Sequence, residues 1–290
     1  MTDLSRKEFR LDWDGHSLEL GKKTRIMGVL NVTPDSFSDG GIFFSREKAV
    51  EQALAMEADG ADIIDIGGES TRPYAEKVSL EQELDRVIPV IEELSRAVKI
   101  PLSIDTYKAA VAEKAVQAGA TIINDISAFR FDPEMVKVAK NSGVPVILMH
   151  MKGTPGNMQD NPVYDDLMGE IKAFFSEAIN KAEKSGIAKN MLILDPGIGF
   201  GKSFNHNLQI IRDLKKLEDL DLPVLLGSSR KAFIGNILDK PAEQRDTGTM
   251  ATVAAGIMNG AHIVRVHNVG MAKDTVKIMD AILSGEFISA

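Results

Sequence analysis

The sequence predicts a closed (β/α)8 barrel that is preceded by a β-hairpin. Eight short apolar segments alternate with helical patterns along the 290 residues, and no linker or low-complexity stretch separates them. Neighbouring strands that are joined by a helix run parallel, because a parallel pair needs a crossover connection. Eight such units favour closure into one barrel.

A doubly wound open sheet is the alternative to the barrel. Open sheets that bind nucleotides carry a GxGxxG or Walker-type glycine loop after a strand. No such signature opens the first unit of this chain, which favours the barrel. We assign residues 1–23 to the hairpin extension and residues 24–290 to a single barrel domain.

The composition excludes several classes of protein. The net charge of −8 argues against a nucleic-acid surface. No apolar run approaches the ~18–20 residues that span a bilayer, so we expect no membrane partner. The chain has no cysteine, which excludes disulfides and is compatible with a reducing compartment. Because the N-terminus also has no apolar signal-peptide core, we expect a cytoplasmic protein.

The expected elements follow in order along the chain. The hairpin is expected at residues 8–22, around the turn dipeptide Asp14-Gly15. The first barrel strand is expected at 26–30 and the first helix at 46–59, which Gly60 ends. Later strands are expected at 62–66, 100–104, 121–123, 144–149, 191–194, 223–226 and 262–266. Helices are expected after Ser79, before Gly119, after Pro133, around 167–178, after Lys231 and around 276–283.

Nearly every predicted strand is followed by a polar residue at its C-terminal side. In a parallel barrel these ends share one face, which is where the active sites of this fold lie. A helix cap or turn role explains any single one of them, but seven at one mouth favour a site. The seven are Asn31, Asp105, Asn124, Asp195, Ser229, Arg265 and His267.

Three of these residues provide hydrogen-bond acceptors at the mouth. Asp105, Asn124 and Asp195 match a planar heterocycle that carries an amino group and a ring N–H. Acidic clusters of this kind also bind divalent metals through oxygen ligands, so a metal site is the alternative.

A second set is cationic and consists of Lys231, Arg265 and His267. Side chains alternate along a strand, so Arg265 and His267 are expected to point the same way. Arginine with a nearby histidine suits phosphate oxygens, and the helix that opens after residues 227–231 adds a positive dipole end. The alternative for the cations is an ion pair with the acidic residues, because a buried arginine needs a partner.

Two loops complete the expected site. Residues 32–41 and the stretch Thr71-Arg72-Pro73 are expected to cover the mouth and to exclude water when substrates bind. The run 197–202 is interpreted as a backbone turn that brings Phe200 near a ligand. The other histidines, His16, His206 and His262, have no metal-ligand spacing and are interpreted as structural.

Eight segments together resemble the dihydropteroate synthases, in the order of that family and between about residues 24 and 285. These segments are Asn31 to Asp39, Gly67 to Pro73, Ser103 to Thr106, Ile123 to Ile126, Leu148 to Met151, Leu194 to Gly197, Ser229 to Lys231 and Arg265 to His267. The resemblance implies a TIM barrel and a transferase of folate biosynthesis. Such an enzyme condenses 6-hydroxymethyl-7,8-dihydropterin diphosphate with 4-aminobenzoate and forms 7,8-dihydropteroate and pyrophosphate.

The resemblance also implies a role for each site residue. The pterin would be bound by Asp105, Asn124, Asp195 and Lys231, and the diphosphate by Asn31, Arg265 and His267, with Mg2+ at Asn31. The aminobenzoate, which sulfonamides mimic, would lie near Thr71, Arg72, Pro73, Phe200 and Ser229. The expected catalytic residues are Asp35, Asp105, Lys231, Arg265 and His267. The chain departs from the family at Ala232, where a serine that contacts the aminobenzoate carboxylate often follows the Ser-Arg-Lys motif.

The implied reaction is an SN1-like displacement in which Lys231 orients the pterin ring and is not a nucleophile. Family members are commonly homodimers, so a homodimer with two small-molecule substrates is expected. The main alternative is a pterin-binding methyltransferase of the methyltetrahydrofolate kind, which needs no diphosphate cations. An imine-forming aldolase that uses Lys231 and a non-catalytic ligand-binding barrel are two further alternatives.

Overall fold

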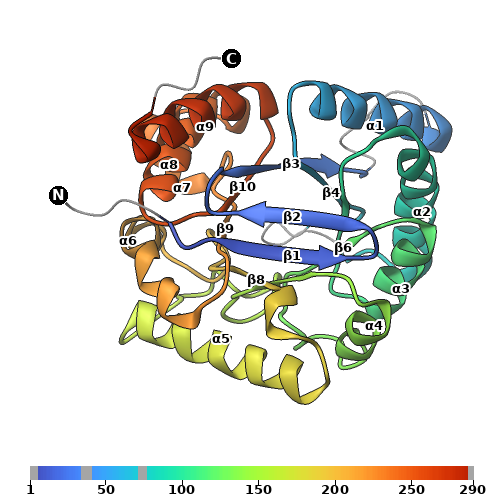
Figure 1. Cartoon of the computed structure of the whole chain (residues 1–290), viewed down its shortest axis with the longest axis horizontal. Helices are drawn as coiled ribbons and strands as arrows, with labels where there is room; N and C mark the ends of the chain where they lie inside the picture. Colours follow the sequence, from blue (N-terminus) through green and yellow to red (C-terminus); the bar gives the residue numbers. More distant parts are fainter. Residues whose placement is uncertain (1–5, 34–40, 71–76, 287–290) are drawn as a thin grey trace.

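The computed structural model describes residues 6–33, 41–70 and 77–286. Eight parallel strands form a barrel inside a ring of helices, which confirms the predicted fold class (Figure 1). The strands are β3 (Arg25–Asn31), β4 (Ile63–Gly67), β5 (Leu102–Asp105), β6 (Ile122–Asp125), β7 (Val146–Met149), β8 (Leu192–Asp195), β9 (Leu225–Leu226) and β10 (Ile263–Val266).

The helices follow the strands in sequence. They are α1 (Gly41–Ala58), α2 (Leu80–Ala97), α3 (Ala109–Ala118), α4 (Met135–Ser142), α5 (Leu167–Lys184), α6 (Phe204–Asp213), α7 (Ala232–Leu238), α8 (Asp246–Met258) and α9 (Val269–Ser284). Short 3-10 helices lie between them and include η2 (Lys189–Met191), η3 (Leu214–Leu220) and η4 (Ala242–Gln244). In the part of the chain that the structure describes, no helix is long and apolar enough to cross a membrane.

The strands pair in the order β8-β7-β6-β5-β4-β3-β10-β9, and a parallel bridge between Leu194 and Val224 closes the circle. The strands are short and their apolar side chains are almost completely buried, as expected where both faces of a parallel sheet are covered. The register aligns Asn31 with Gly67, Gly67 with Asp105, and Asp105 with Asn124. The barrel therefore carries a row of residues across four strands at its C-terminal end.

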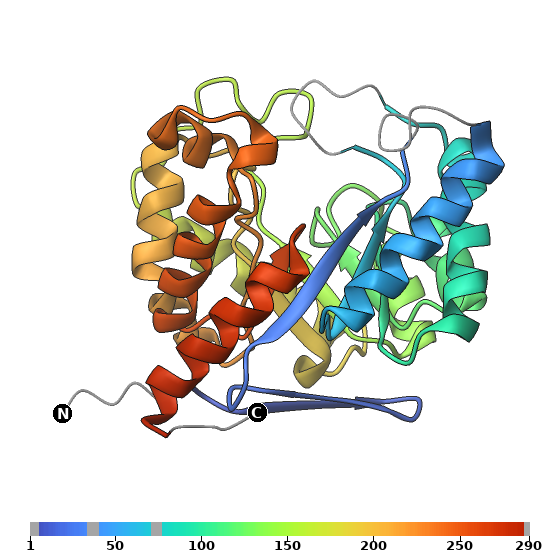
Figure 2. The ribbon, with the colours of Figure 1, turned by 90° about the horizontal axis from the view of Figure 1, so that it is seen from above.

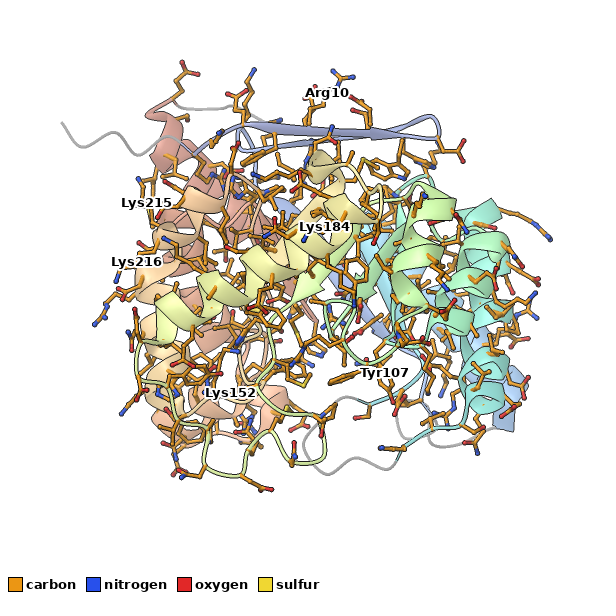
Figure 3. All side chains as sticks on the ribbon, turned by 90° about the horizontal axis from the view of Figure 1, so that it is seen from below. Arg10, Tyr107, Lys152, Lys184, Lys215 and Lys216 are labelled. Carbon is orange, nitrogen blue, oxygen red and sulfur yellow. The ribbon has the colours of Figure 1, made fainter. Side chains whose placement is uncertain are left out.

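A two-stranded hairpin covers the opposite end of the barrel (Figure 2). Its strands β1 (Phe9–Trp13) and β2 (His16–Leu20) pair antiparallel, as predicted. Asp14 and Gly15 both have positive φ angles, of 38° and 77°, which the tight turn between twisted strands requires. Arg10 lies on this hairpin at one end of the molecule, and Tyr107 and Lys152 lie toward the other end (Figure 3).

The arm that precedes the hairpin is anchored by one buried arginine. Arg6 Nη1 donates hydrogen bonds to Thr24 Oγ1 at 2.6 Å and to the carbonyl of Ala261 at 2.7 Å. Its Nη2 donates to Asp280 Oδ1 on α9 at 2.9 Å. The guanidinium therefore joins the first part of the chain to its last helix.

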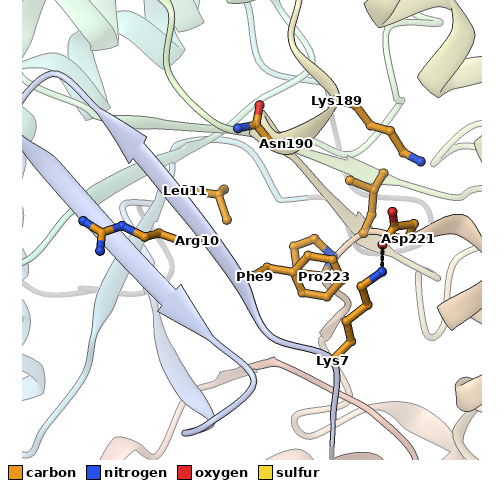
Figure 4. Close-up of a pocket in the computed structure, with 9 residues that line it drawn as sticks. Lys7, Phe9, Arg10, Leu11, Lys189, Asn190, Asp221 and Pro223 are labelled. Carbon is orange, nitrogen blue, oxygen red and sulfur yellow. Dashed lines mark hydrogen bonds and ion pairs between the residues drawn. The ribbon is translucent and has the colours of Figure 1, made fainter.

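A pocket of about 280 Å3 lies beside the hairpin (Figure 4). Phe9 and Pro223 line it, and Lys7 forms an ion pair with Asp221 at its edge. Asp221 and Pro223 precede β9, so this pocket lies at the N-terminal end of the strands. Active sites of this fold lie at the other end.

Several element bounds differ from the prediction. Helix α1 begins at Gly41 and not at residue 46, and β9 has two residues where four were expected. Helices α6 and α8 were not predicted. Helix α8 is rich in small and apolar residues on all sides and so lacks the amphipathic pattern that marks a surface helix. Helix α6 begins with a capping box in which His206, rather than the usual Glu or Gln, completes the pair with Ser203.

Candidate active site

The C-terminal end of the barrel carries a row of polar side chains around an open position. Gly67 lies between Asn31 and Asp105 in the strand register and has no side chain. A Cβ atom there would lie 3.6 Å from Asp105 Cβ and 3.9 Å from Asn31 Oδ1. The glycine therefore keeps free the space on which the amide and the carboxylate converge.

A partly buried arginine connects the acidic residues of the mouth. Arg265 Nε donates to Asp65 Oδ2 at 2.6 Å, and its Nη2 donates to Asp105 Oδ2 at 2.7 Å. Asn124 Nδ2 donates to the same Asp65 oxygen at 3.0 Å. Burial disfavours the guanidinium, but Asp65 and Asp105 more than offset this and raise the pKa of Arg265. The ion pair that the sequence left open as an alternative is thus present.

The carboxyl group of Asp105 is perturbed by its burial. Burial raises the pKa of Asp105 to about 7, although Arg265 lowers it, and the charge of Asp65 raises it further. The second oxygens, Asp65 Oδ1 and Asp105 Oδ1, are buried and have no hydrogen-bond partner among the described residues. A buried acceptor without a donor is costly, which makes both oxygens suited to the N–H groups of a ligand.

Asp195 lies at the end of β8, across the mouth from Asp105. Its Oδ1 accepts a hydrogen bond from the backbone N–H of Gly197 at 2.7 Å. Burial raises the pKa of Asp195, while the Gly197 bond and the nearby Arg265 and Lys231 lower it. A Cβ on Gly227 would lie 3.8 Å from both Asp195 Oδ2 and Arg265 Cβ, so this glycine lies between the Asp195 carboxylate and the Arg265 side chain.

Lys231 and Phe200 come together from two different loops. The Lys231 Nζ lies 4.2 Å from the centroid of the Phe200 ring, a cation–π contact. Lys231 is the residue that precedes α7, and Phe200 follows β8. The predicted pterin-binding lysine and the predicted aminobenzoate-side phenylalanine are therefore neighbours.

Ser229 and His267 also meet, at the ends of β9 and β10. Ser229 Oγ accepts a hydrogen bond from the backbone N–H of His267 at 3.2 Å and lies 2.9 Å from its Nδ1. The residue between Ser229 and Lys231 is Arg230, which has a left-handed φ of 57°. Its guanidinium makes a two-pronged ion pair with Asp246 on α8, at 2.7 and 2.9 Å. The helix that was not predicted thus fixes the turn that carries two site residues.

The structure brings together nine of the residues that the sequence predicted for the site. Eight of them lie near the C-terminal ends of barrel strands or in the loops that follow, namely Asn31, Asp105, Asn124, Asp195, Phe200, Ser229, Arg265 and His267. The ninth, Lys231, contacts Phe200. The predicted residues Asp35, Thr71, Arg72 and Pro73 lie outside the described residues.

Two buried residues of this region were missed by the sequence reasoning. Asp65 is completely buried in β4 between isoleucines, and Lys202 is 2% exposed at the end of the Phe200 loop. The signal was present for Asp65, because a carboxylate inside an apolar strand needs a charged or hydrogen-bonding partner. Two of the histidines that were interpreted as structural have such roles: His206 is part of the α6 cap, and His262 bonds backbone atoms through both ring nitrogens.

Comparison with known proteins identifies the family of this chain. Residues 27–267 match a family described as pterin binding enzyme. The dihydropteroate synthase of Synechocystis sp. is 50% identical over 263 residues, which cover 90% of this chain and 91% of that enzyme. The chain belongs to the dihydropteroate synthase family. It is therefore an enzyme, a transferase of folate synthesis.

Solved structures of dihydropteroate synthases have the same fold. The Yersinia pestis enzyme in complex with a sulfonamide drug is 46% identical and has a TM-score of 0.90, covering 96% of this chain and 100% of that one. The Xanthomonas albilineans dihydropteroate synthase with 4-aminobenzoic acid is 45% identical and has a TM-score of 0.89, covering 95% and 98%. These relatives are synthases, which favours the main interpretation of the sequence over the methyltransferase alternative.

Proposed function

We propose that the barrel mouth binds the pterin between Asp105, Asn124 and Asp195 and transfers its methylene carbon to the amino nitrogen of 4-aminobenzoate. The observation that carries this proposal is the network of Arg265, Asp65 and Asp105, which leaves two buried carboxylate oxygens without donors among the described residues. An aminopyrimidine ring presents an amino group and a ring N–H, which are the donors that such oxygens need. Each charge-assisted hydrogen bond of this kind contributes ~1.5–3 kcal/mol.

The diphosphate would lie on the Arg265 and His267 side of the mouth. The guanidinium has five N–H donors, and its bonds to Asp65 and Asp105 use only two of them. Those two bonds also fix the plane of the group, so that it faces an anion without a further loss of side-chain entropy. His267 is positioned by Ser229 at the same end of the barrel.

Mg2+ remains an expectation, and the residues fit it in one specific manner. The described residues hold no group of three or more His, Asp or Glu side chains that would form a protein cage for a metal. Asn31 Oδ1 faces the open position above Gly67 and offers an oxygen ligand of the kind that Mg2+ prefers. Magnesium commonly keeps several waters and binds through one or two protein oxygens together with substrate phosphates. When bound, it would neutralise charge on the leaving diphosphate.

The proposed reaction breaks the carbon–oxygen bond before the new bond forms. The diphosphate leaves with the electron pair, and a cationic pterin methylene remains, which the Asp105 carboxylate stabilises by its charge. The amino nitrogen of aminobenzoate donates its lone pair to the methylene carbon and then loses a proton to solvent water. Lys231 orients the pterin ring, and Phe200 and Ser229 position the aminobenzoate. Asp35, Thr71, Arg72 and Pro73 keep their predicted roles as part of this proposal.

Pyrophosphate release tests the proposed function directly. With both substrates and Mg2+, we expect steady-state release at a normal enzymatic rate. Without aminobenzoate, release should stop at about one equivalent per enzyme, because bond breakage precedes the attack of the amine. Chelation with EDTA should lower the rate about 100-fold, because the charge on the leaving group is then neutralised by side chains alone, and added Mg2+ should restore it. Release that is independent of aminobenzoate, or that continues at full rate in EDTA, would contradict the proposal.

A homodimer is also part of the proposal and is supported by exposed apolar side chains on α9. Ile278 is 63% exposed and Ile282 is 54% exposed, and residues four apart share one face of a helix. Helix α7, which contacts α8 as α9 does, also has an exposed isoleucine, Ile237, at 61%. The absence of cysteine supports a cytoplasmic location, which likewise remains a prediction.

The double variant Ile278→Glu with Ile282→Glu tests the dimer. We expect the unchanged protein to elute with the mass of a dimer in light-scattering chromatography and the variant to elute as a folded monomer, because two buried charges at an interface are costly. Leu54→Glu is the matched control, because Leu54 is exposed on α1 and should not affect the mass. A monomeric unchanged protein would disprove the dimer.

A further inference from the structure

A buried lysine lies behind the Phe200 loop and has no role in the reaction as described so far. Lys202 is 2% exposed, although lysine side chains normally reach solvent. Its Nζ lies 2.9 Å from His150 Nδ1, 3.2 Å from the carbonyl oxygen of His150 and 2.9 Å from the carbonyl oxygen of Phe200. One amine therefore joins the segment after β7 to the residue that carries the Phe200 ring.

The protonation of this pair follows from its burial. Burial lowers the pKa of His150 to about 2, and the charge of Lys202 lowers it as well, so the imidazole is neutral. Burial lowers the pKa of Lys202 to about 7, while Asp195 raises it. An ammonium donates to all three partners, and a neutral amine donates to the two carbonyls and accepts from His150. The hydrogen bonds are thus satisfied in both forms.

The loop between Gly197 and Lys202 packs backbone against backbone on the segment after β7. A Cβ on Gly197 would lie 2.0 Å from the His150 carbonyl oxygen, and one on Gly201 would lie 2.4 Å from the carbonyl oxygen of Lys152. Both glycines have positive φ angles, of 69° and 64°. Lys202 bonds both sides of this contact, and Gln159 and Tyr164 add hydrogen bonds to the carbonyls of Gly199 and Gly201.

Phe200 lies within this loop and Asp195 precedes it. Both residues belong to the proposed site. The Phe200 ring lies 4.2 Å from Lys231 Nζ, and Asp195 accepts from the N–H of Gly197 within the same loop. A shift of the Phe200 backbone would move the ring relative to Lys231. Displacements of about 1 Å in positioning groups reduce enzymatic rates by up to about 100-fold.

We propose that Lys202 is a positioning residue that, through hydrogen bonds to His150 and to the Phe200 carbonyl, holds the Phe200 ring in register with Lys231 for the aminobenzoate substrate. This inference rests on the proposed function. The Lys202 side chain is buried and its amine bonds His150 and the Phe200 carbonyl, so we assign it an effect through Phe200 and no contact with substrate.

The absence of cysteine from the chain permits a matched chemical test. The variant Lys202→Cys is alkylated in urea with bromoethylamine, which restores a lysine-like amine, or with 1-iodopropane, which gives a side chain of the same length without one. Both products are refolded and compared by circular dichroism and thermal unfolding. Their steady-state kinetics are then measured by pyrophosphate release.

We expect the amine-bearing product to have the KM for aminobenzoate of the unchanged enzyme. The propyl product should have a KM about tenfold higher with a similar kcat, because the ring is mispositioned while the reacting groups are intact. In a Phe200→Leu background the two products should have equal KM values, because Lys202 then has no ring to position.

Equal KM values for the two products in the Phe200-containing enzyme would overturn the positioning role. An equal loss of thermal stability and of activity in both products would also overturn it. If the propyl product does not refold, Lys202→Met produced directly in cells provides the same comparison, and a normal KM there overturns the role. An unchanged enzyme that releases no pyrophosphate would instead contradict the proposed function, so the two failures are distinguishable.

Discussion

Replacing Arg265 by methionine is expected to lower kcat/KM for the pterin diphosphate by about a thousandfold. The change removes donors for the diphosphate and also leaves Asp65 and Asp105 facing each other without their shared cation. Arg265 lowers the pKa of Asp105, so the loss of Arg265 raises that pKa above its present value of about 7. The carboxyl group would then be protonated at neutral pH and could no longer stabilise a cationic methylene.

Arg265→Lys is the matched control for this prediction. It keeps the charge but cannot bond both carboxylates in one plane, so we expect activity between those of the unchanged enzyme and the methionine variant. Steady-state pyrophosphate release measures all three. A methionine variant within about tenfold of the unchanged enzyme would show that Arg265 has only a structural role, because a transition-state contact is worth more.

Arg265→Met is also expected to lower the free energy of unfolding by about 3–5 kcal/mol, which is the usual cost of removing one partner from a buried ion pair. The double variant Asp65→Asn with Arg265→Met should recover part of this loss, since no uncompensated charge then remains in β4. Urea titration followed by circular dichroism measures both. A double variant that is less stable than Arg265→Met alone would contradict the account of the network.

The pH dependence is the second large effect that we expect. Burial raises the pKa of Asp105 to about 7, and the proposed reaction uses its carboxylate form. The kcat/KM for the pterin diphosphate should therefore fall about tenfold for each pH unit below 7 and level off above it. Asp105→Asn should lower the rate at neutral pH and remove this acidic limb. A limb that persists unchanged in Asp105→Asn would assign it to another group.

Stability should change with pH in the opposite direction. The pKa of Asp105 rises from 3.8 to about 7 on folding, so the folded protein binds the proton more tightly. The contribution of this group to the free energy of unfolding is therefore fully present below pH 3.8 and is lost as the pH rises through about 7. Asp105→Asn should remove this dependence, which unfolding titrations at several pH values would detect. The ionisation that activates the site thus destabilises the fold.

The barrel could be predicted from the sequence because local patterns of apolar and polar residues determine its strands and helices. The ion-pair and hydrogen-bond partners within the site could not be predicted in this way. Asp105 and Asn124 follow apolar segments, and parallel strands place such residues at one face. The choice of partner for Arg265 depends on distance in space, and Asp65 lies 200 positions away in sequence. No local pattern marks that pairing. Asp65 was overlooked because the pattern of its strand, and not its charge, was used to interpret it.

The site also depends on an element that periodicity does not detect. Helix α8 has apolar residues on all sides, so it lacks the signal that identifies a surface helix. It nevertheless provides Asp246, which holds Arg230 in its left-handed conformation beside Ser229. Lys202 is similar, because only the tertiary packing of two glycine-rich turns shows that its amine is buried.

The bond between Arg6 and Asp280 has a consequence for how the protein is made. These residues are 274 positions apart, and the neighbouring strands β3 and β10 come from opposite ends of the chain. During synthesis the hairpin and β3 leave the ribosome before β4 to β9, and their partners β10 and α9 leave it after these strands. One edge of β3 therefore stays unpaired until β10 has been made, a period in which unpaired strand edges favour aggregation. Chaperone dependence of the nascent chain should accordingly end only when α9 is released.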